Sequence, residues 1–451
     1  MVHRVLITQD IYLTENRYRG SQMKFSSLGL ATPIQEAIDA CGYSTMTPVQ
    51  ELTIAKARRG QDLLVNAQTG TGKTAAFALP ILHQMLETPK DTISCRPRAL
   101  ILTPTRELAE QLAEVIGRYA QFTSLNVVAI YGGVKMGGQT SKLKNGIDVL
   151  IATPGRLLEH MNLNNVTLAS AEFVVLDEAD RMLDMGFIAD VNSIFQHTAK
   201  KRQTLLYSAT SSPAVNELCH KILHNHAEIR VNKMNAAADS VNHIMYPVEE
   251  SKKIDLFKRL LSEQNWFQVL VFTSTKDQAD KLMSALKLSK IEAAVCHGDK
   301  SQGSRRRALA DFKSAKLQVL IATEVAARGL DIQGLDFVVN YNLPYLPEDY
   351  VHRIGRTGRA GNAGNAISFV SREEERTVAR IESLIGASIK RVIKPGFEVS
   401  DRQSLLKSIS TNRRPNKTNK ASKTQITGDK VKAKRPNKPK SRPAKRTSIK
   451  K

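Results

Sequence analysis

A stretch of eight residues has the composition of a phosphate-binding loop. Ala67–Thr74 reads Ala-Gln-Thr-Gly-Thr-Gly-Lys-Thr, with alanine where the general pattern has its first glycine. Gly70 and Gly72 lack a Cβ atom, so the backbone can curl around a phosphate and turn its N–H groups inward. Lys73 can reach the β- and γ-phosphates, and the Thr74 hydroxyl can ligate Mg²⁺. The stretch therefore predicts a site for a nucleoside triphosphate.

Two adjacent carboxylates follow another apolar run about a hundred residues later. Asp177 and Glu178 come directly after Val174–Leu176, and ligand sites of open α/β sheets lie at the carboxyl ends of strands. Asp177 is suited to hold Mg²⁺ through water, sharing the ion with Thr74. Glu178 is the candidate to orient and deprotonate the attacking water. With the loop, these carboxylates predict hydrolysis of the bound triphosphate.

Both motifs are flanked by patterns typical of a parallel α/β sheet. The loop lies between an apolar run at 62–65 and a helical pattern at 75–82. Continuous apolar runs indicate strands buried on both faces. Two series of such runs occur, at 99–103, 127–131, 148–152, 173–176 and 204–207, and then at 269–272, 293–296, 319–322, 337–340 and 366–370. Helical patterns separate them, so we expect an α/β fold of two tandem, doubly wound parallel-sheet domains, of which only the first carries a phosphate loop.

Two helix starts precede the loop. Thr32-Pro33 and Thr47-Pro48 each place an N-cap residue before a proline, which is favoured at the first helical position. The first helix is expected to end near Ala40. Gln50 lies just inside the second helix, and its amide offers the donor and the acceptor that the edge of adenine requires. Gln50 is therefore a candidate for recognising the base.

Positive charge is concentrated at the carboxyl end. The formal net charge is +23, and residues 411–451 hold sixteen Lys or Arg against one acid, Asp429, which leaves +8 for the other 410 residues. A mildly basic body with a strongly basic tail predicts a polyanionic partner. Nucleic acid is favoured over a membrane surface because the tail lacks aromatic residues and an amphipathic stripe. No run approaches about 18 apolar residues, so no membrane span is expected.

A chain of 451 residues is too long for one core. We expect an unassigned extension at 1–22, a first domain at 23–232, a linker at 233–240, a second domain at 241–395 and a basic tail at 396–451. The tail should be mostly disordered because it cannot bury enough apolar surface. No periodic pattern precedes Met23, so we expect the native start there and a dispensable extension. The four cysteines lie far apart, which favours buried free thiols in a reducing cytoplasm.

Seven motifs stand in a fixed order along the chain. They are Ala67–Thr74, Pro104–Ala109, Thr153–Arg156, Asp177–Asp180, Ser208–Thr210, Ala327–Asp331 and His352–Arg359. In this order and spacing they resemble the DEAD-box ATP-dependent RNA helicase family, whose two domains are RecA-like. The resemblance covers about residues 23–390. His297–Arg305 and Pro347–Arg353 look closest to the bacterial RhlE-like subgroup.

The resemblance implies a nucleotide site to which both domains contribute. Arg356 and Arg359 resemble arginine fingers that reach the γ-phosphate, for which a planar, permanently charged guanidinium is suited. Asp331 resembles a ribose-binding acid. The implied catalytic residues are Lys73, Glu178, Arg356 and Arg359, and the implied metal ligands are Thr74 and Asp177. The implied nucleotide-contacting residues are Phe25, Tyr43, Gln50, Ala67, Gln68, Thr69, Gly70, Thr71, Gly72, Lys73, Thr74, Asp177, Glu178, Gly329, Asp331, Arg356 and Arg359.

The resemblance also implies residues for coupling and for RNA. Ser208, Thr210 and His352 would link hydrolysis to strand separation. The implied RNA-binding positions are Pro104, Thr105, Arg106, Gly132, Gly133, Thr153, Pro154, Gly155, Arg156, Gln302, Arg305 and Thr323. Such glycines, hydroxyls and arginines suit a grip on the sugar-phosphate backbone without reading bases. One departure is Glu324, where the family commonly has aspartate; the acid is one methylene longer, which bears on geometry more than on function.

The implied function is an RNA-dependent ATPase and helicase that unwinds short duplexes locally or remodels RNA–protein complexes. ATP and Mg²⁺ would be its cofactors, RNA its partner within ribosomal-precursor or RNA-turnover assemblies, and the cytoplasm its location, with a monomeric core. Two alternatives stay open. An ATP-switched RNA clamp or annealing chaperone would show little unwinding, and a DNA translocase would lack RNA-specific stimulation of its ATPase.

Overall fold

The computed structural model describes residues 11–12, 23–67, 70–90, 95–231, 241–327, 332, 334–358 and 364–399. The predicted linker and the predicted disorder of the tail beyond Val399 lie outside the described residues, as does the extension at 1–22 apart from Ile11–Tyr12. Candidate site residues that also lie outside them are Gln68, Thr69, Gly329, Asp331 and Arg359.

Among the described residues, the first sheet has eight strands in the order β1-β8-β2-β7-β6-β3-β5-β4. They are β1 (Ile11–Tyr12), β2 (Leu63–Asn66), β3 (Ala99–Leu102), β4 (Val127–Ile130), β5 (Val149–Ala152), β6 (Phe173–Leu176), β7 (Gln203–Ser208) and β8 (Ala227–Arg230). Every neighbouring pair is parallel. Successive side chains point to opposite faces, so Leu63 and Val65 enter one core and Leu64 enters another.

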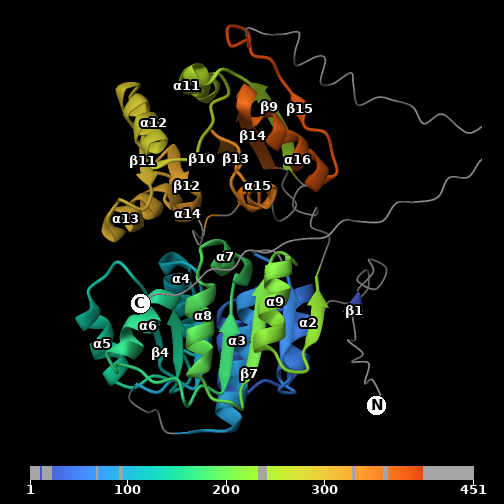
Figure 1. The fold of residues 1–451 in the computed structure, drawn as a ribbon, viewed down its shortest axis with the longest axis vertical. Helices are drawn as coiled ribbons and strands as arrows, with labels where there is room; N and C mark the ends of the chain where they lie inside the picture. The colour runs from blue at the N-terminus through green and yellow to red at the C-terminus, as the bar shows by residue number, and fades with distance from the viewer. Residues whose placement is uncertain are drawn as a thin grey trace, which may run out of the picture. The chain divides into compact units, whose positions relative to one another are not determined.

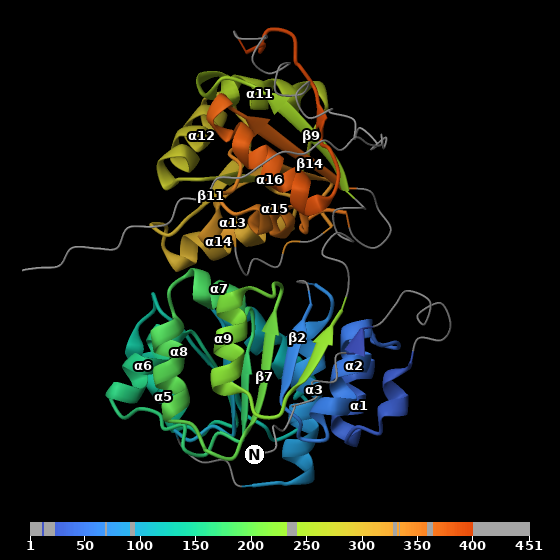
Figure 2. The same ribbon diagram turned by 45° about the vertical axis from the view of Figure 1, so that its right-hand side comes forward.

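Helices cover both faces of this sheet (Figures 1 and 2). The helical segments are η2 (Phe25–Leu28), α1 (Thr32–Ala40), α2 (Pro48–Ala57), α3 (Lys73–Glu87), α4 (Arg106–Tyr119), α5 (Met136–Lys144), α6 (Pro154–Asn162), α7 (Ala179–Asp184), α8 (Ile188–Gln196) and α9 (Pro213–Ile222). Helices α1 to α4 pack on the core that holds Leu63, and α5 to α9 pack on the core that holds Leu64. Four of them begin with proline in the first turn, where its missing N–H costs nothing.

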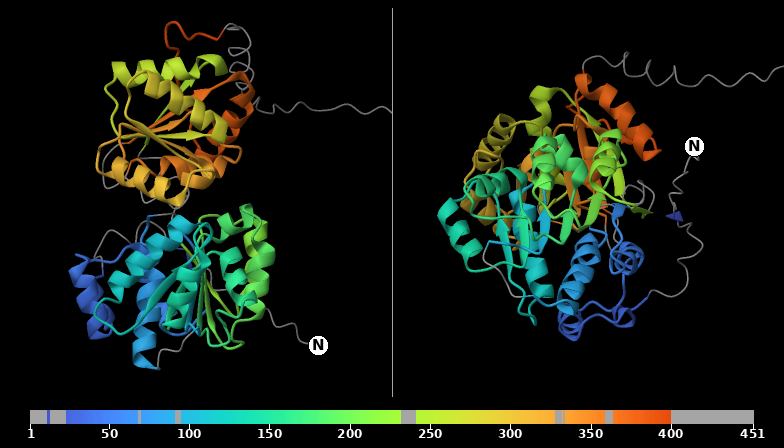
Figure 3. Two further views of the ribbon diagram at one scale, coloured as in Figure 1. Left: turned by 90° about the vertical axis from the view of Figure 1, so that its left-hand side faces the viewer. Right: turned by 60° about the horizontal axis from the view of Figure 1, so that its bottom comes forward.

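The second sheet, as far as the chain is described, has seven parallel strands in the order β11-β12-β10-β13-β14-β9-β15. They are β9 (Val241–Pro247), β10 (Val269–Thr273), β11 (Ala293–Cys296), β12 (Val319–Thr323), β13 (Phe337–Asn340), β14 (Gly364–Val370) and β15 (Lys390–Arg391). Its helical segments are η3 (Glu250–Lys252), α11 (Lys253–Glu263), α12 (Lys276–Leu288), α13 (Gln302–Lys313), α14 (Glu324–Ala327), α15 (Pro347–Ile354), η4 (Arg372–Glu374) and α16 (Glu375–Ile385). Helices again cover both faces (Figure 3).

The predicted fold class is confirmed, and the strand that precedes the loop and both series of apolar runs are strands of the two sheets. Four strands were not predicted: β1, β8, β9 and β15. The two-residue strands are too short to carry a pattern, and β8 alternates between buried and more exposed residues. Although no periodic pattern precedes Met23, a strand does, because Ile11–Tyr12 pairs with Ile229–Arg230.

The order of the strands brings the predicted active-site residues of the first sheet together. Strands β2, β7 and β6 are neighbours and parallel, so their carboxyl ends lie at one edge of the sheet. The phosphate loop follows β2, Ser208 ends β7, and Asp177 follows β6. Residues more than a hundred positions apart in the sequence therefore lie at the same edge of the sheet.

The cysteines agree with the sequence expectation in part. All four cysteines are free; Cys219 and Cys296 are buried, whereas Cys41 and Cys95 are half-buried. The free thiols are confirmed, but full burial holds for only two of them. No helix within the described ranges is both long enough and apolar enough to cross a bilayer.

Gly364, the first residue of β14, tests how tightly the second sheet is packed. A Cβ atom at this position would overlap Thr357 Oγ1 and the backbone of Gly358. We expect Gly364→Ala to lower the melting temperature by several degrees, because overpacking against backbone costs about 1–3 kcal/mol. Gly117→Ala is the control, since a Cβ there meets no atom within 4 Å and alanine favours helix. Equal melting temperatures for the two variants would contradict this packing.

Candidate active site and nucleic-acid interface

The phosphate loop leads directly into α3. Gly70 and Gly72 adopt φ values of 80° and 95°, which side chains disfavour, and Gly72 is the N-cap residue of α3. The unpaired N–H groups of the first helical turn therefore face the loop. Lys73 is 6% exposed, and no described residue accepts a hydrogen bond from its Nζ, which lies 3.8 Å from Asp177 Oδ1. A buried ammonium in this state is suited to an anionic ligand.

The candidate adenine residues lie beside this loop. Gln50 is buried; its Oε1 accepts a hydrogen bond from Thr47 N at 2.8 Å, and its Nε2 donates to Gly72 O at 3.2 Å. The ring of Phe25 stacks on that of Tyr43, with centroids 6.3 Å apart. Gln50 thus joins the start of α2 to the end of the loop, and its role toward a base stays a prediction.

The acidic pair follows β6. Asp177 is 4% exposed, and its Oδ1 accepts a hydrogen bond from Glu178 N at 3.1 Å. Glu178 has a left-handed backbone (φ 56°), a conformation that non-glycine residues adopt mainly under constraint. Burial raises the pKa of the Asp177 carboxyl, against the effect of Lys73. Burial also raises the pKa of Glu178, and Asp177 and Asp180 act in the same direction. A raised pKa suits a carboxylate that must accept a proton.

Asp180 connects the acidic motif to the Ser208–Thr210 segment. Its Oδ2 accepts hydrogen bonds from Ala209 N at 3.1 Å and from Thr210 N at 3.0 Å. Ser208 Oγ donates to the carbonyl oxygen of Thr210 at 2.7 Å. Asp180 is the fourth residue of the acidic motif, and its residue type and spacing alone predicted no role for it. Any shift of this acid therefore moves the backbone of Ala209 and Thr210 directly.

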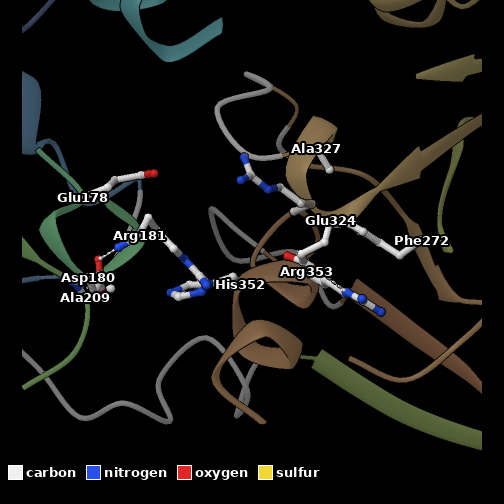
Figure 4. Close-up of a pocket in the computed structure, with 10 residues that line it drawn as sticks. Glu178, Asp180, Arg181, Ala209, Phe272, Glu324, Ala327, His352 and Arg353 are labelled. Carbon is white, nitrogen blue, oxygen red and sulfur yellow. Dashed lines mark hydrogen bonds and ion pairs between the residues drawn. The ribbon is translucent and has the colours of Figure 1, made fainter. Parts of the chain in front are cut away.

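A small cavity of about 20 Å³, which holds about one water, brings together residues of both sheets. Figure 4 shows Glu178 and Arg181 on one side and His352, Arg353 and Glu324 on the other. The lining residues are Glu178, Asp180, Arg181, Ala209, Phe272, Glu324, Ala327, His352, Arg353 and Arg356. The structure therefore places the described candidate finger, Arg356, and the candidate base, Glu178, at one cavity.

Arg353 has a structural role in the second sheet. Its guanidinium is 2% exposed and donates to Asn340 Oδ1 at 3.1 Å, to the carbonyl oxygen of Asn342 at 2.7 Å and to Glu324 Oε2 at 2.6 Å. It also lies over the ring of Phe272. The longer acid at position 324 therefore still reaches the arginine. Glu324 thereby ties α14 to α15.

A larger cavity of about 880 Å³ collects most of the predicted RNA residues. Eight of the twelve line it: Pro104, Thr105, Arg106, Gly132, Gly133, Thr153, Arg305 and Thr323. The other four, which are not among its lining residues, are Pro154, Gly155, Arg156 and Gln302. Lining residues that the sequence analysis missed are Glu107, Met185, Phe187, Ser274, Thr275, Lys276, Asp277, Gly298, Val325 and Ala326. Several of these residues follow the carboxyl ends of β10, β11 and β12. Ligand sites of open α/β sheets lie at such ends, so the apolar runs of the sequence could have indicated them.

The arginines of this cavity are held by acids and by close packing. Arg305 is 5% exposed, and its Nη2 lies 2.8 Å from Glu107 Oε1, which is also 3.5 Å from Arg106 Nε. A Cβ on Gly133 would overlap Arg106 Nη1. Glycine at this position, with φ of 80°, therefore lets the Arg106 guanidinium lie against the chain.

Comparisons with known proteins show the family of this chain. A family model described as DEAD/DEAH box helicase matches residues 47–218, and one described as Helicase conserved C-terminal domain matches residues 252–361. The ATP-dependent RNA helicase RhlB of Pseudomonas aeruginosa is 42% identical over 377 residues, which cover 82% of this chain and 95% of that protein. The chain belongs to the DEAD-box ATP-dependent RNA helicases. CshA of Listeria monocytogenes is 42% identical over 351 residues, covering 78% of this chain and 66% of CshA.

Solved structures of other DEAD-box helicases share the fold. Saccharomyces cerevisiae Dbp5 bound to RNA and ADP BeF3 matches with a TM-score of 0.73 and 31% identity, over 86% of this chain and 99% of that one. Mss116p bound to ssRNA and AMP-PNP matches with a TM-score of 0.75 and 26% identity, over 87% and 83%. The named curated relatives are RhlB and CshA helicases, so the likeness to the RhlE-like subgroup stays a prediction.

The described residues of this helicase fit a metal site completed by nucleotide phosphates and water better than a metal site made of protein ligands alone. Within the described part of the chain, no group of three or more His, Cys, Asp or Glu side chains could hold a metal ion. Mg²⁺ at nucleotide sites usually has one or two protein ligands, with phosphates and water completing its shell. Thr74 at the start of α3 and Asp177 after β6 supply oxygens of that kind.

Gly133 gives a direct test of the RNA interface. Gly133→Ala should displace the Arg106 guanidinium and weaken RNA binding roughly tenfold, the scale of one hydrogen bond to a charged group. ATP binding without RNA should stay unchanged, because the phosphate loop is untouched. The measurements are RNA titration by fluorescence anisotropy and nucleotide binding by calorimetry. Gly138→Ala in α5 is the matched control, since its Cβ meets no atom within 4 Å. Unaltered RNA affinity in Gly133→Ala would exclude this role of Arg106.

Proposed function

We propose that ATP hydrolysis occurs between the phosphate loop, the Asp177–Glu178 pair and Arg356, and that RNA lies in the 880 Å³ cavity. The observation that carries the proposal is the buried Lys73 ammonium, which no described residue accepts a hydrogen bond from and which lies 3.8 Å from Asp177 Oδ1. A triphosphate supplies the missing acceptors. Mg²⁺, when bound, would be held by Thr74 and Asp177 and would neutralise charge on the phosphates.

Each remaining residue then has a defined part in the reaction. Glu178 orients a water molecule and accepts its proton as the water attacks the γ-phosphate. Lys73 and Arg356, with Arg359 as a second finger, stabilise charge on the transferring phosphoryl group. Phe25, Tyr43 and Gln50 take the adenine, while Gly329 and Asp331 take the ribose side.

Coupling to RNA passes through the Asp180 hydrogen bonds. Because Asp180 follows the catalytic acid by two residues and holds Ala209 and Thr210, a change at the γ-phosphate can shift the Ser208–Thr210 segment. His352 lines the same small cavity and completes this connection. RNA gripped by Arg106 and Arg305 would then be strained, which opens a short duplex locally rather than by travel along it.

Other expectations extend this proposal beyond the core. RNA is taken through its backbone, in keeping with the glycines and arginines of the cavity. We place the protein in the cytoplasm, as a monomer acting on ribosomal precursors or in RNA turnover. We also propose domain limits of 23–232 and 241–395, joined by a linker at 233–240.

Glu178→Gln is the first test of the active site. We expect ATP and RNA binding to persist and turnover to fall by on the order of a hundredfold or more, the scale of a lost general base. Steady-state ATPase with saturating RNA measures it. Glu217→Gln, at an exposed position on α9, is the control for the loss of a carboxylate. Turnover of Glu178→Gln close to that of the control would remove Glu178 from this role.

The basic tail should supply RNA affinity rather than catalysis. Its sixteen cations can meet phosphates and release counterions. If about four to six do so on single-stranded RNA, the tail contributes a slope of roughly −3 to −4 to log K against log salt. Deleting residues 411–451 should flatten that slope and leave ATPase at saturating RNA unchanged. RNA titrations at several salt concentrations measure it, and identical slopes would show that the tail does not bind RNA.

A further inference from the structure

Arg181, the residue directly after the acidic motif, is buried in spite of its charge. It is 5% exposed, and its Nη1 contacts Asp349 of α15 as well as Asp184 of its own helix, at 3.1 Å from Asp184 Oδ2. Its backbone N–H donates to Asp180 Oδ1 at 3.0 Å. One residue therefore touches the acid that holds the Ser208–Thr210 segment and the helix that leads to Arg356.

Asp349 is connected to Arg356 through helix α15. It lies on α15, one turn before Arg353, which is fixed by hydrogen bonds to Asn340, Asn342 and Glu324. The turn continues past the helix, since Arg356 N donates to the carbonyl oxygen of Arg353 at 3.2 Å. A displacement of Asp349 therefore displaces Arg356, together with the second sheet.

Both partners of this ion pair are shielded from water. The side chains of Arg181 and Asp349 are 7% and 8% exposed, whereas Asp184 is 37% exposed. A buried pair responds strongly to the loss of one partner because the other charge stays uncompensated. An exposed pair contributes little. Asp349 is thus the partner whose loss should matter, and Asp184 provides a matched comparison on the same arginine.

We propose that Arg181 is a positioning residue: through Asp349 it sets the place of Arg356 relative to Glu178, and through Asp180 it links that placement to the Ser208–Thr210 segment. This inference rests on the proposed function of Arg356 and Glu178. Figure 4 shows Arg181 extending from the Asp180 side toward His352, in the direction of α15. A purely structural ion pair would stabilise the fold but would not single out the RNA-stimulated step.

Charge reversal separates these roles. We expect Arg181→Asp and Asp349→Arg each to lower the RNA-stimulated kcat by about tenfold or more, the scale of breaking a buried ion pair. ATP affinity of the RNA-free protein should stay unchanged, because Lys73 and the loop are untouched. The double variant should recover most of the lost kcat, since the charges then match again. Asp184→Asn should keep wild-type kcat.

The measurements are kcat and KM for RNA in the ATPase assay, ATP binding without RNA, and the melting temperature. Failure of the double variant to recover kcat while both single variants fold would overturn the proposal, as would wild-type kcat in both singles. If a reversal does not fold, Arg181→Lys and Asp349→Asn replace it: reduced kcat in Asp349→Asn with near-normal kcat in Arg181→Lys supports the proposal, and the opposite order overturns it.

A second comparison keeps this result apart from the proposed function itself. Glu172→Gln breaks the ion pair with Arg98 inside the first sheet's domain; it should lower the melting temperature without lowering kcat. An equal loss of kcat in Glu172→Gln and Asp349→Asn would reduce Arg181 to a stabilising residue. Absence of RNA-stimulated ATPase in the wild-type protein would instead contradict the proposed function.

Discussion

The burial of Lys73 beside Asp177 is the constraint on which the rest of the active site depends. Both side chains are less than 10% exposed, and their 3.8 Å separation leaves the ammonium near a carboxylate without a hydrogen bond to it. Burying charges is costly unless they are paired and hydrogen-bonded. The parallel order β2-β7-β6 imposes this arrangement, because it brings the ends of three strands to one edge. The fold thus buries a lysine and an aspartate side by side at the end of the phosphate loop, as a nucleotide-binding site requires.

The cations of the RNA cavity differ from Lys73 in how they are paired. There both lining arginines have an acidic partner: Arg305 and Arg106 each contact Glu107. Acids therefore hold the cations in place and lower the net positive charge of the groove. If Arg305 binds an RNA phosphate as proposed, that phosphate must compete with Glu107, so backbone binding would depend on geometry as well as on charge. This contrasts with the sequence beyond Thr411, whose cations are nearly free of nearby acids in the chain.

Motif chemistry and strand periodicity could be predicted from the sequence because both are local. The helix at Pro48–Ala57 follows from its N-cap Thr47 and its proline, and the apolar runs follow from burial on both faces. The predicted N-cap Thr32 is instead the first residue of its helix, whose N-cap is Ala31. Strands β8 and β9 could not be predicted in this way, because neither is a continuous run of buried apolar residues: β8 alternates between buried and more exposed residues, and β9 has three more exposed residues after its first. The position of Asp180 also depends on hydrogen bonds from the segment after β7, which no local pattern encodes. Arg353 shows that residue type alone does not predict a role, because this arginine of a basic motif is a buried structural residue.

The two sheets contribute unequal parts, and this inequality gives the enzyme a reason to have two domains. The first sheet holds the phosphate loop, the acidic pair and half of the RNA cavity, whereas the second supplies Arg356, Arg305 and Thr323 without a phosphate loop of its own. In the proposed function, hydrolysis and RNA binding each use side chains of both halves. In the proposed mechanism, the contact of Arg181 with Asp349 positions Arg356 of the second domain toward a phosphate bound by the first. A residue with no contact to either substrate would then influence the rate.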